Sequence, residues 1–140
     1  MKQIFMDTNV VIDFLANRQP FSLDAAKLFN MSLEGRIRIH ISAVSYNNIY
    51  YVLRQSLTNN ATIKLLENLA EITEITDVSN QVIRQSLKTD FKDYEDAIQY
   101  YSALTVPNID FIVTRNTKDF KKSTLPVLTP TEAIALLSSK

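Results

Sequence analysis

The first fifteen residues of the chain, Met1–Leu15 (MKQIFMDTNVVIDFL), decide the fold. A short apolar run ends at Asp7, and a longer apolar pattern, interrupted by Asp13, begins three residues later. A short apolar run followed by helical spacing predicts a buried strand that leads into a helix. In open α/β sheets ligands bind outside the carboxyl ends of the strands, so Asp7 is the first candidate site residue.

Strand and helix patterns alternate along the rest of the chain. Further strands are expected at 36–41, 72–75, 109–113 and 126–128, and helices at 22–33, 43–57, 61–69, 79–88, 94–104 and 131–137, with a loop or short helix at 115–120. Short strands that alternate with helices predict an α/β fold with a parallel sheet covered on both faces. No linker or repeat interrupts the pattern, so residues 1–140 are expected to form one domain.

The composition excludes several kinds of chemistry. The chain has no cysteine and only one glycine, so thiol catalysis, cysteine-based zinc sites and glycine-rich phosphate loops are excluded. Its single histidine, His40, lies in an alternating strand pattern and is interpreted as structural. The formal net charge is zero, which gives no support for nucleic-acid binding through bulk charge but leaves a local basic patch open. Neither a secretory signal nor a membrane span is recognised, so a cytoplasmic protein is expected.

Acidic and amide side chains fall at the predicted carboxyl edge of the sheet. Asp7 ends the first strand, Asp96 lies in the first turn of a helix, and Asn116 and Asp119 follow the fourth strand. Parallel strands share one carboxyl edge, so these residues can converge. Carboxylates brought together repel one another unless a cation intervenes, and Mg²⁺ is held by one or two carboxylates plus waters and phosphates. This pattern predicts metal-assisted hydrolysis of phosphodiester bonds.

Four stretches in this order and spacing resemble the PIN-domain ribonucleases, including the toxins of bacterial toxin–antitoxin pairs. They are MDTNV at 6–10, ISAVS at 41–45, DYEDAIQY at 93–100 and IVTRNTKDF at 112–120. The resemblance implies a three-layer α/β/α sandwich with a central parallel sheet. It also implies a Mg²⁺- or Mn²⁺-dependent endonuclease that acts on RNA. A homodimer and an antitoxin partner are expected on the same grounds, with no membrane association.

Position by position, the resemblance assigns roles to these residues. Asp7 and Asp96 match the first and third metal-binding acids of the family. Asn116 matches the fourth position, which is often Asp, and Asp119 is a metal-binding acid in reserve. Residues expected to support this set are Asp93, Asn9 and Thr114, and those expected to contact RNA phosphates are Arg115 and Lys118.

Asn48 departs from the family pattern. The second acid of the family is usually a Glu placed three residues after a Ser or Thr, and counting from Ser45 that position is Asn48. An amide can coordinate a metal through its oxygen, but it brings no charge and cannot act as a base. Asn48 is therefore a catalytic candidate whose contribution is uncharged, or else an ordinary helix residue, as Asn116 could be an ordinary turn residue.

The same residues also have structural interpretations. Asp7 and Asp93 could each cap the helix that follows. Asp13 is interpreted as a solvated residue or a partner of Arg18, and Asp119 could serve only to bond a loop. The basic residues around 115–122 could be a solvated loop rather than a phosphate contact.

The predicted function is a metal-dependent endoribonuclease, and the protein could be the toxin of a toxin–antitoxin pair. The alternative is a PIN-fold module that binds RNA or a protein partner and has lost catalysis. An aspartyl-phosphate phosphatase with Asp7 as nucleophile is disfavoured, because that chemistry usually wants a second Asp two residues later, where this chain has Asn9.

Overall fold

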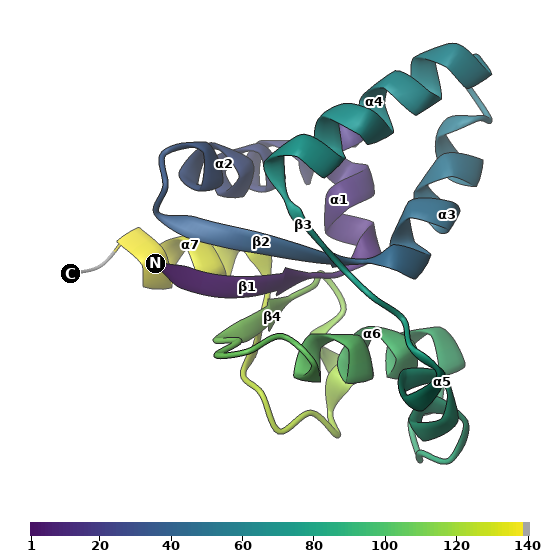
Figure 1. The fold of residues 1–140 in the computed structure, drawn as a ribbon. Helices are drawn as coiled ribbons and strands as arrows, with labels where there is room; N and C mark the ends of the chain where they lie inside the picture. Colours follow the sequence, from purple (N-terminus) through teal and green to yellow (C-terminus); the bar gives the residue numbers. More distant parts are fainter. Residues whose placement is uncertain (139–140) are drawn as a thin grey trace.

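The strands of the chain are all parallel and form one sheet in the order β3-β2-β1-β4-β5 (Figure 1). The computed structural model describes residues 1–138. The strands in it are β1 (Lys2–Met6), β2 (Ile37–Ser42), β3 (Glu74–Thr76), β4 (Phe111–Val113) and β5 (Val127–Leu128). The α/β fold with a central parallel sheet that the sequence predicted is confirmed.

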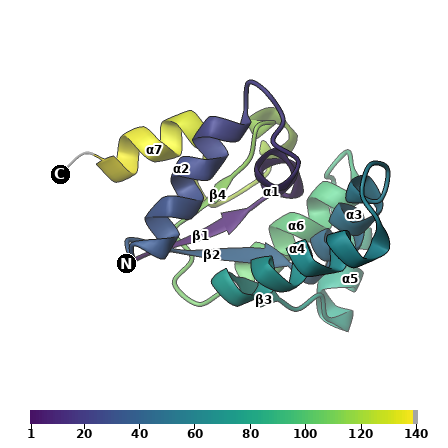
Figure 2. The ribbon, with the colours of Figure 1, turned by 90° about the horizontal axis from the view of Figure 1, so that it is seen from above.

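Helices cover both faces of the sheet. They are α1 (Thr8–Leu15), α2 (Ser22–Leu33), α3 (Ala43–Leu53), α4 (Asn59–Ile72), α5 (Asn80–Leu87), α6 (Tyr94–Leu104) and α7 (Pro130–Ser138), with a short 3-10 helix, η1 (Thr117–Phe120). In Figure 1, α1 to α4 lie on one side of the sheet and α5 and α6 on the other, and Figure 2 shows α7 beside α2. None of the helices within residues 1–138 has the length and apolar character needed to cross a membrane.

The sheet divides the core into two clusters. Ile4 and Met6 of β1 pack with the helices on the α1 side, whereas Phe5 belongs to the cluster of Tyr100 on α6 and Phe120 on η1. All three β1 side chains are fully buried. A strand buried on both faces must be apolar at every position, which explains the unbroken apolar run before Asp7.

The register of the sheet places the end of β1 beside the end of β4. Met6 is opposite Val113, and the backbone N–H of Asp7 donates to the carbonyl of Val113 at 2.9 Å. The residues that follow the two strands, Asp7 and Thr114, therefore emerge at the same edge. Segments more than one hundred residues apart in sequence meet there.

Several element boundaries differ from the sequence prediction. Helix α3 ends at Leu53 instead of near 57, because the chain tightens into turn bonds over 54–57 before Thr58 caps α4 with its hydroxyl. Helix α4 continues to Ile72, so β3 begins two residues later than predicted. Strand β4 begins only at Phe111, after a turn at Asn108, where φ is 59°.

Replacing Gly35, which follows α2, with alanine tests the backbone at this turn. Its φ is +77°, a left-handed conformation, and an added Cβ would meet no atom within 4 Å. The cost of Gly35→Ala is therefore conformational, and we expect the free energy of unfolding to fall by roughly 1 kcal/mol. Urea denaturation followed by circular dichroism measures it, and an unchanged unfolding midpoint would contradict the assigned turn.

Candidate active site

A hollow of about 320 Å³ opens at the carboxyl edge of the sheet. Its lining residues are Asp7, Thr8, Asn9, Ile12, Arg18, Asn48, Val52, Glu95, Asp96, Gln99 and Asn116. Five of them were predicted from the sequence, and they come from the end of β1, from α1, α3 and α6, and from the segment after β4. A larger hollow of about 410 Å³ lies beside Arg115 and Asn116, but its only carboxylate, Asp24, accepts a hydrogen bond from the Thr131 hydroxyl. The smaller hollow, where carboxylates gather, is therefore the candidate site.

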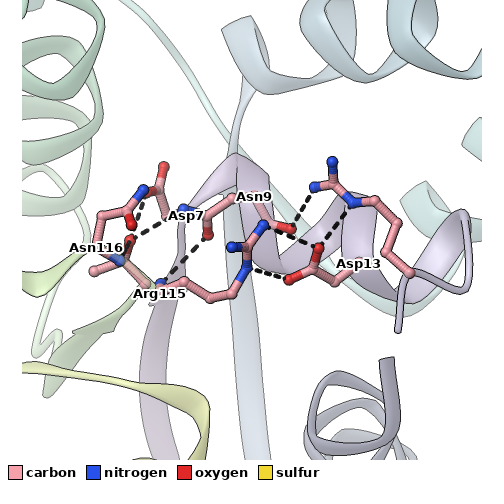
Figure 3. Close-up of polar contacts among 7 residues, drawn as sticks. Asp7, Asn9, Asp13, Arg115 and Asn116 are labelled. Carbon is pink, nitrogen blue, oxygen red and sulfur yellow. Dashed lines mark hydrogen bonds and ion pairs between the residues drawn. The ribbon is translucent and has the colours of Figure 1, made fainter. Parts of the chain in front are cut away.

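Asp7 is held in place from two directions. The backbone N–H of Thr8 donates to its Oδ1 at 2.8 Å, and the Thr114 hydroxyl donates to its Oδ2 at 2.7 Å. Asn9 reaches the same hydroxyl with its Nδ2 at 3.4 Å, and the backbone N–H of Asn116 donates to it at 3.1 Å (Figure 3). Asp7 also occupies the N-cap position of α1. Capping explains the bond from Thr8 but not the bond from Thr114, which follows β4.

The charged forms of Asp7 and Asp96 are disfavoured. Burial raises the pKa of Asp7, which is 7% exposed, against the lowering effect of its bonds to Thr114 and Thr8. Burial also raises the pKa of Asp96 to about 7, and the negative charges of Asp93, Asp7, Asp119 and Glu95 add to this. The acids at this edge thus lie close enough to repel one another.

No cationic side chain within residues 1–138 forms an ion pair with Asp7, Glu95, Asp96 or Asp119. A hard divalent ion would relieve the repulsion among them, and Mg²⁺ needs only one or two carboxylates if waters complete its shell. In the described chain no three acidic or histidine side chains are arranged to hold an ion by themselves. The donor set therefore fits a metal ion that is coordinated partly by water, and not one that is coordinated by protein ligands alone.

A hydroxyl and amide network forms the floor of the hollow. The hydroxyls of Thr8 and Ser45 are 2.6 Å apart, and Gln99 Nε2 donates to Ser45 Oγ at 3.0 Å. These bonds join α1, α3 and α6 behind the acids. Gln99 Oε1 is buried and has no hydrogen-bond partner among the described residues.

Glu95 is a site residue that the sequence prediction missed. Its Oε2 accepts a hydrogen bond from Asn48 Nδ2 at 2.7 Å. The available signal was helical geometry, since Glu95 and Gln99 are four residues apart and share one face of α6. The family motif points instead to its neighbour Asp96.

Asp13 corrects one sequence interpretation. It is 1% exposed, so the expectation of a solvated residue is wrong, while the expected pairing with Arg18 is confirmed, with Arg18 Nε 2.9 Å from its Oδ1. Arg115 Nε donates to its Oδ2 at 2.6 Å (Figure 3), and the Arg115 guanidinium lies 4.0 Å from the centre of the Phe21 ring. The Arg115 guanidinium, which was predicted to contact RNA, is thus bound to a buried carboxylate. Arg18 is bound to the same carboxylate and also lines the hollow.

The remaining predicted residues lie outside the hollow. Asp93 caps α6 by accepting from the backbone N–H of Asp96 at 3.0 Å, as one interpretation of the sequence proposed. Asp119 and Lys118 are exposed on η1. The Asp119 charge still reaches the site, because it contributes to the raised pKa of both Asp7 and Asp96. His40 lies on β2, with its Nε2 2.7 Å from Gln3 Oε1.

Comparison with known proteins identifies the family. A profile described as the PIN domain matches residues 3–118, which is most of the chain. The chain belongs to the PIN-domain family, whose members are nucleases. Among curated proteins no match is found.

Solved structures with the same fold include a toxin–antitoxin complex and a sarcin–ricin-loop-cleaving toxin. A DNA-bound VapBC complex from Salmonella typhimurium aligns with a TM-score of 0.70 and 17% identity over 93% of this chain and 99% of that chain. A toxin–antitoxin complex from Klebsiella pneumoniae aligns with a TM-score of 0.63 and 25% identity over 91% and 97%. VapC20 of Mycobacterium tuberculosis, described as a toxin that cleaves the sarcin–ricin loop, aligns with a TM-score of 0.61 and 14% identity over 78% and 86%.

The pairing of Asp13 with two arginines should dominate the local stability. We expect Asp13→Asn to lower the free energy of unfolding by about 2–3 kcal/mol, because an amide faces two guanidinium donors with a donor of its own. Glu74→Gln is the matched control, since it removes one partner of an exposed pair with Arg38 and should cost less than about 1 kcal/mol. Urea denaturation of both variants measures the difference, and equal losses would show that the buried cluster is not special.

The raised pKa of Asp96 predicts a pH-dependent gain in stability on neutralisation. In the unfolded chain Asp96 ionises near its ordinary pKa of 3.8 and in the folded chain near 7, so ionisation begins to destabilise the fold above pH 3.8 and does so fully above pH 7. In metal-free buffer with a chelator, Asp96→Asn should therefore raise the free energy of unfolding at pH 8 by about 1 kcal/mol, allowing for solvent screening of a partly exposed group. The gain should vanish at pH 4. Thermal melts at both pH values measure it, and a gain that is the same at both would contradict the assigned cause.

Proposed function

We propose that this PIN-domain protein is a metal-dependent endoribonuclease and the toxin component of a toxin–antitoxin pair. The observation that carries the proposal is a set of carboxylates, including the buried Asp7, at the carboxyl edge of the sheet with no cationic partner among the described residues. Burying an acid without a countercharge is costly, and a fold that does so at a ligand-binding edge suits a cation. The nuclease nature of the family supports the same function.

Each side chain has a separate task in this proposal. Asp7 and Asp96 hold Mg²⁺ or Mn²⁺, Asn48 and Asn116 offer amide oxygens, and Asp119 adds negative charge from η1. A bound ion of this kind supplies an oriented water of lowered pKa and stabilises charge on the phosphate. The supporting residues Thr114 and Asn9 fix Asp7 through the hydroxyl bonds described above, and Asp93 fixes the first turn of α6.

In this proposal, RNA phosphates contact Arg18 in the hollow and the exposed cation Lys118 outside it. Arg18 lines the hollow and keeps 42% of its side chain exposed while Asp13 holds its Nε. Lys118 is exposed on η1, and Arg115 holds Asp13 at the other side. Contacts of this type give affinity without sequence preference, so they position RNA and leave the choice of substrate to the shape of the hollow.

Partners follow from the systems that share the fold. The Klebsiella structure is a toxin–antitoxin complex, which supports an antitoxin as partner of this chain. We propose a homodimer for the toxin and a cytoplasmic setting, where it would meet cellular RNA.

The alternative is a PIN-fold module that binds RNA or protein without cleaving it. Two of the four family positions, Asn48 and Asn116, are neutral here. Such a module would bind RNA in the presence of Mn²⁺ without turnover, which separates it from the enzyme in a single assay.

RNA cleavage with and without metal tests the proposal. Labelled single-stranded and hairpin RNAs should be cleaved in Mn²⁺ or Mg²⁺ and spared in EDTA. Asp7→Asn should lower the rate on the order of 100-fold or more, because it removes a charge that holds the ion. Glu67→Gln, on the exposed side of α4, is the control and should cleave at the wild-type rate. Cleavage by Asp7→Asn at the wild-type rate, with its fold verified by circular dichroism, would reject the assigned site.

A further inference from the structure

Asn48 and Glu95 face each other across the two helical layers. Asn48 lies on α3 and Glu95 on the first turn of α6, and these helices cover opposite faces of the sheet (Figure 1). The bond of 2.7 Å between Asn48 Nδ2 and Glu95 Oε2 bridges them at the carboxyl edge, and both residues line the hollow. The position where the family usually carries a Glu thus touches a Glu that comes from another helix.

The chemistry of this pair fixes the direction of its hydrogen bond. An ionised carboxylate only accepts hydrogen bonds, so Asn48 must turn its amide nitrogen toward Glu95 and its oxygen away. The bond is charge-assisted, which holds Glu95 without neutralising it. Glu95 keeps Oε1 and its full charge, and Asn48 keeps a carbonyl oxygen, so both residues retain a group that a hard cation can bind.

We propose that Glu95 is the metal-binding acid that replaces the missing carboxylate at Asn48, and that Asn48 is a positioning residue for it. The inference rests on the proposed function, since it concerns the same ion. It differs from the family pattern in assigning the second acid to α6, next to Asp96, instead of to α3. The charge of the site is thereby kept while its source has moved from one layer to the other.

Three further observations support this assignment. The Glu95 charge contributes to the raised pKa of both Asp7 and Asp96, so it lies within electrostatic reach of both. On the same face of α6, Gln99 lines the hollow with a buried Oε1 that has no partner among the described residues, and an unsatisfied buried oxygen favours a donor or a cation nearby. Glu95 itself is exposed and forms no ion pair within residues 1–138, so no described cationic side chain competes with an ion for its carboxylate.

A simple structural role for the Asn48–Glu95 bond makes a different prediction. If the bond only connects α3 to α6, then Glu95→Gln should leave the affinity for Mn²⁺ unchanged, because a glutamine oxygen still accepts from Asn48 Nδ2. If Glu95 binds the ion, the same substitution removes the charge and leaves the bond. This variant therefore separates the two roles without disturbing the packing.

The experiment is isothermal titration of MnCl₂ into the full chain. Glu95→Gln should weaken Mn²⁺ binding by about 10-fold or more, since affinity for hard cations follows the number of charged ligands. Glu67→Gln removes an equal charge from an exposed residue that does not line the hollow, and it should bind Mn²⁺ like the wild type. Thermal melts in EDTA show whether each variant remains folded.

A double variant returns the charge to the family position. Asn48→Asp with Glu95→Gln keeps the pair isosteric and reverses the direction of its hydrogen bond, so that the amide donates from α6 to a carboxylate on α3. It should recover most of the affinity that Glu95→Gln loses, to within about threefold of the wild type, because the number of carboxylates is restored. Recovery would support the proposal through a gain of function, which loss of folding cannot imitate.

The outcomes separate this inference from the proposed function. Weak binding by Glu95→Gln together with recovery in the double variant supports it. Wild-type Mn²⁺ affinity in Glu95→Gln, with binding lost in Asp7→Asn, would overturn the role of Glu95 and leave the metal site at Asp7 intact. Absence of Mn²⁺ binding by the wild-type chain would overturn both the inference and the metal-dependent function.

Discussion

The shared carboxyl edge of a fully parallel sheet is the constraint on which the site depends. Because β1 lies between β2 and β4 and runs parallel to both, its last residue emerges beside the residue that follows β4. This geometry brings the Thr114 hydroxyl onto Asp7 and places the start of α3, after β2, at the same edge. Residues from four segments that are distant in sequence can then surround one hollow.

Asp7 and Asp13 are buried carboxylates six residues apart, and their charges are balanced differently. Asp13 is enclosed by Arg18 and Arg115, so its charge is balanced within the fold and its role is structural. Asp7 has only hydrogen bonds, and burial raises its pKa. A fold that places a paired acid and an unpaired acid so close together points to the unpaired one as the group kept for a ligand.

The sequence predicted the features that local patterns determine, and it missed the contacts between side chains on different elements. The buried strand that precedes Asp7 and the capped helix that carries Asp96 follow from local periodicity, so both were predicted. The bonds from Asn48 to Glu95 and from Arg115 to Asp13 join side chains on different elements, and no local pattern encodes which pairs meet. The end of α3 was missed for a related reason, since the apolar positions that suggested a longer helix continue through a turn.

The effect of the neutral Asn48 on metal binding depends on the residues around it. Taken alone, Asn48 indicates a weakened metal site, because an amide brings an oxygen but no charge. In the fold, the amide holds a carboxylate that approaches from α6, and Asp7, Glu95 and Asp96 all line the hollow. A cation responds to the field of the whole site and not to the helix that supplies each charge. The number of carboxylates around the hollow, and not their order along the chain, is therefore the measure of whether the site can hold a divalent ion.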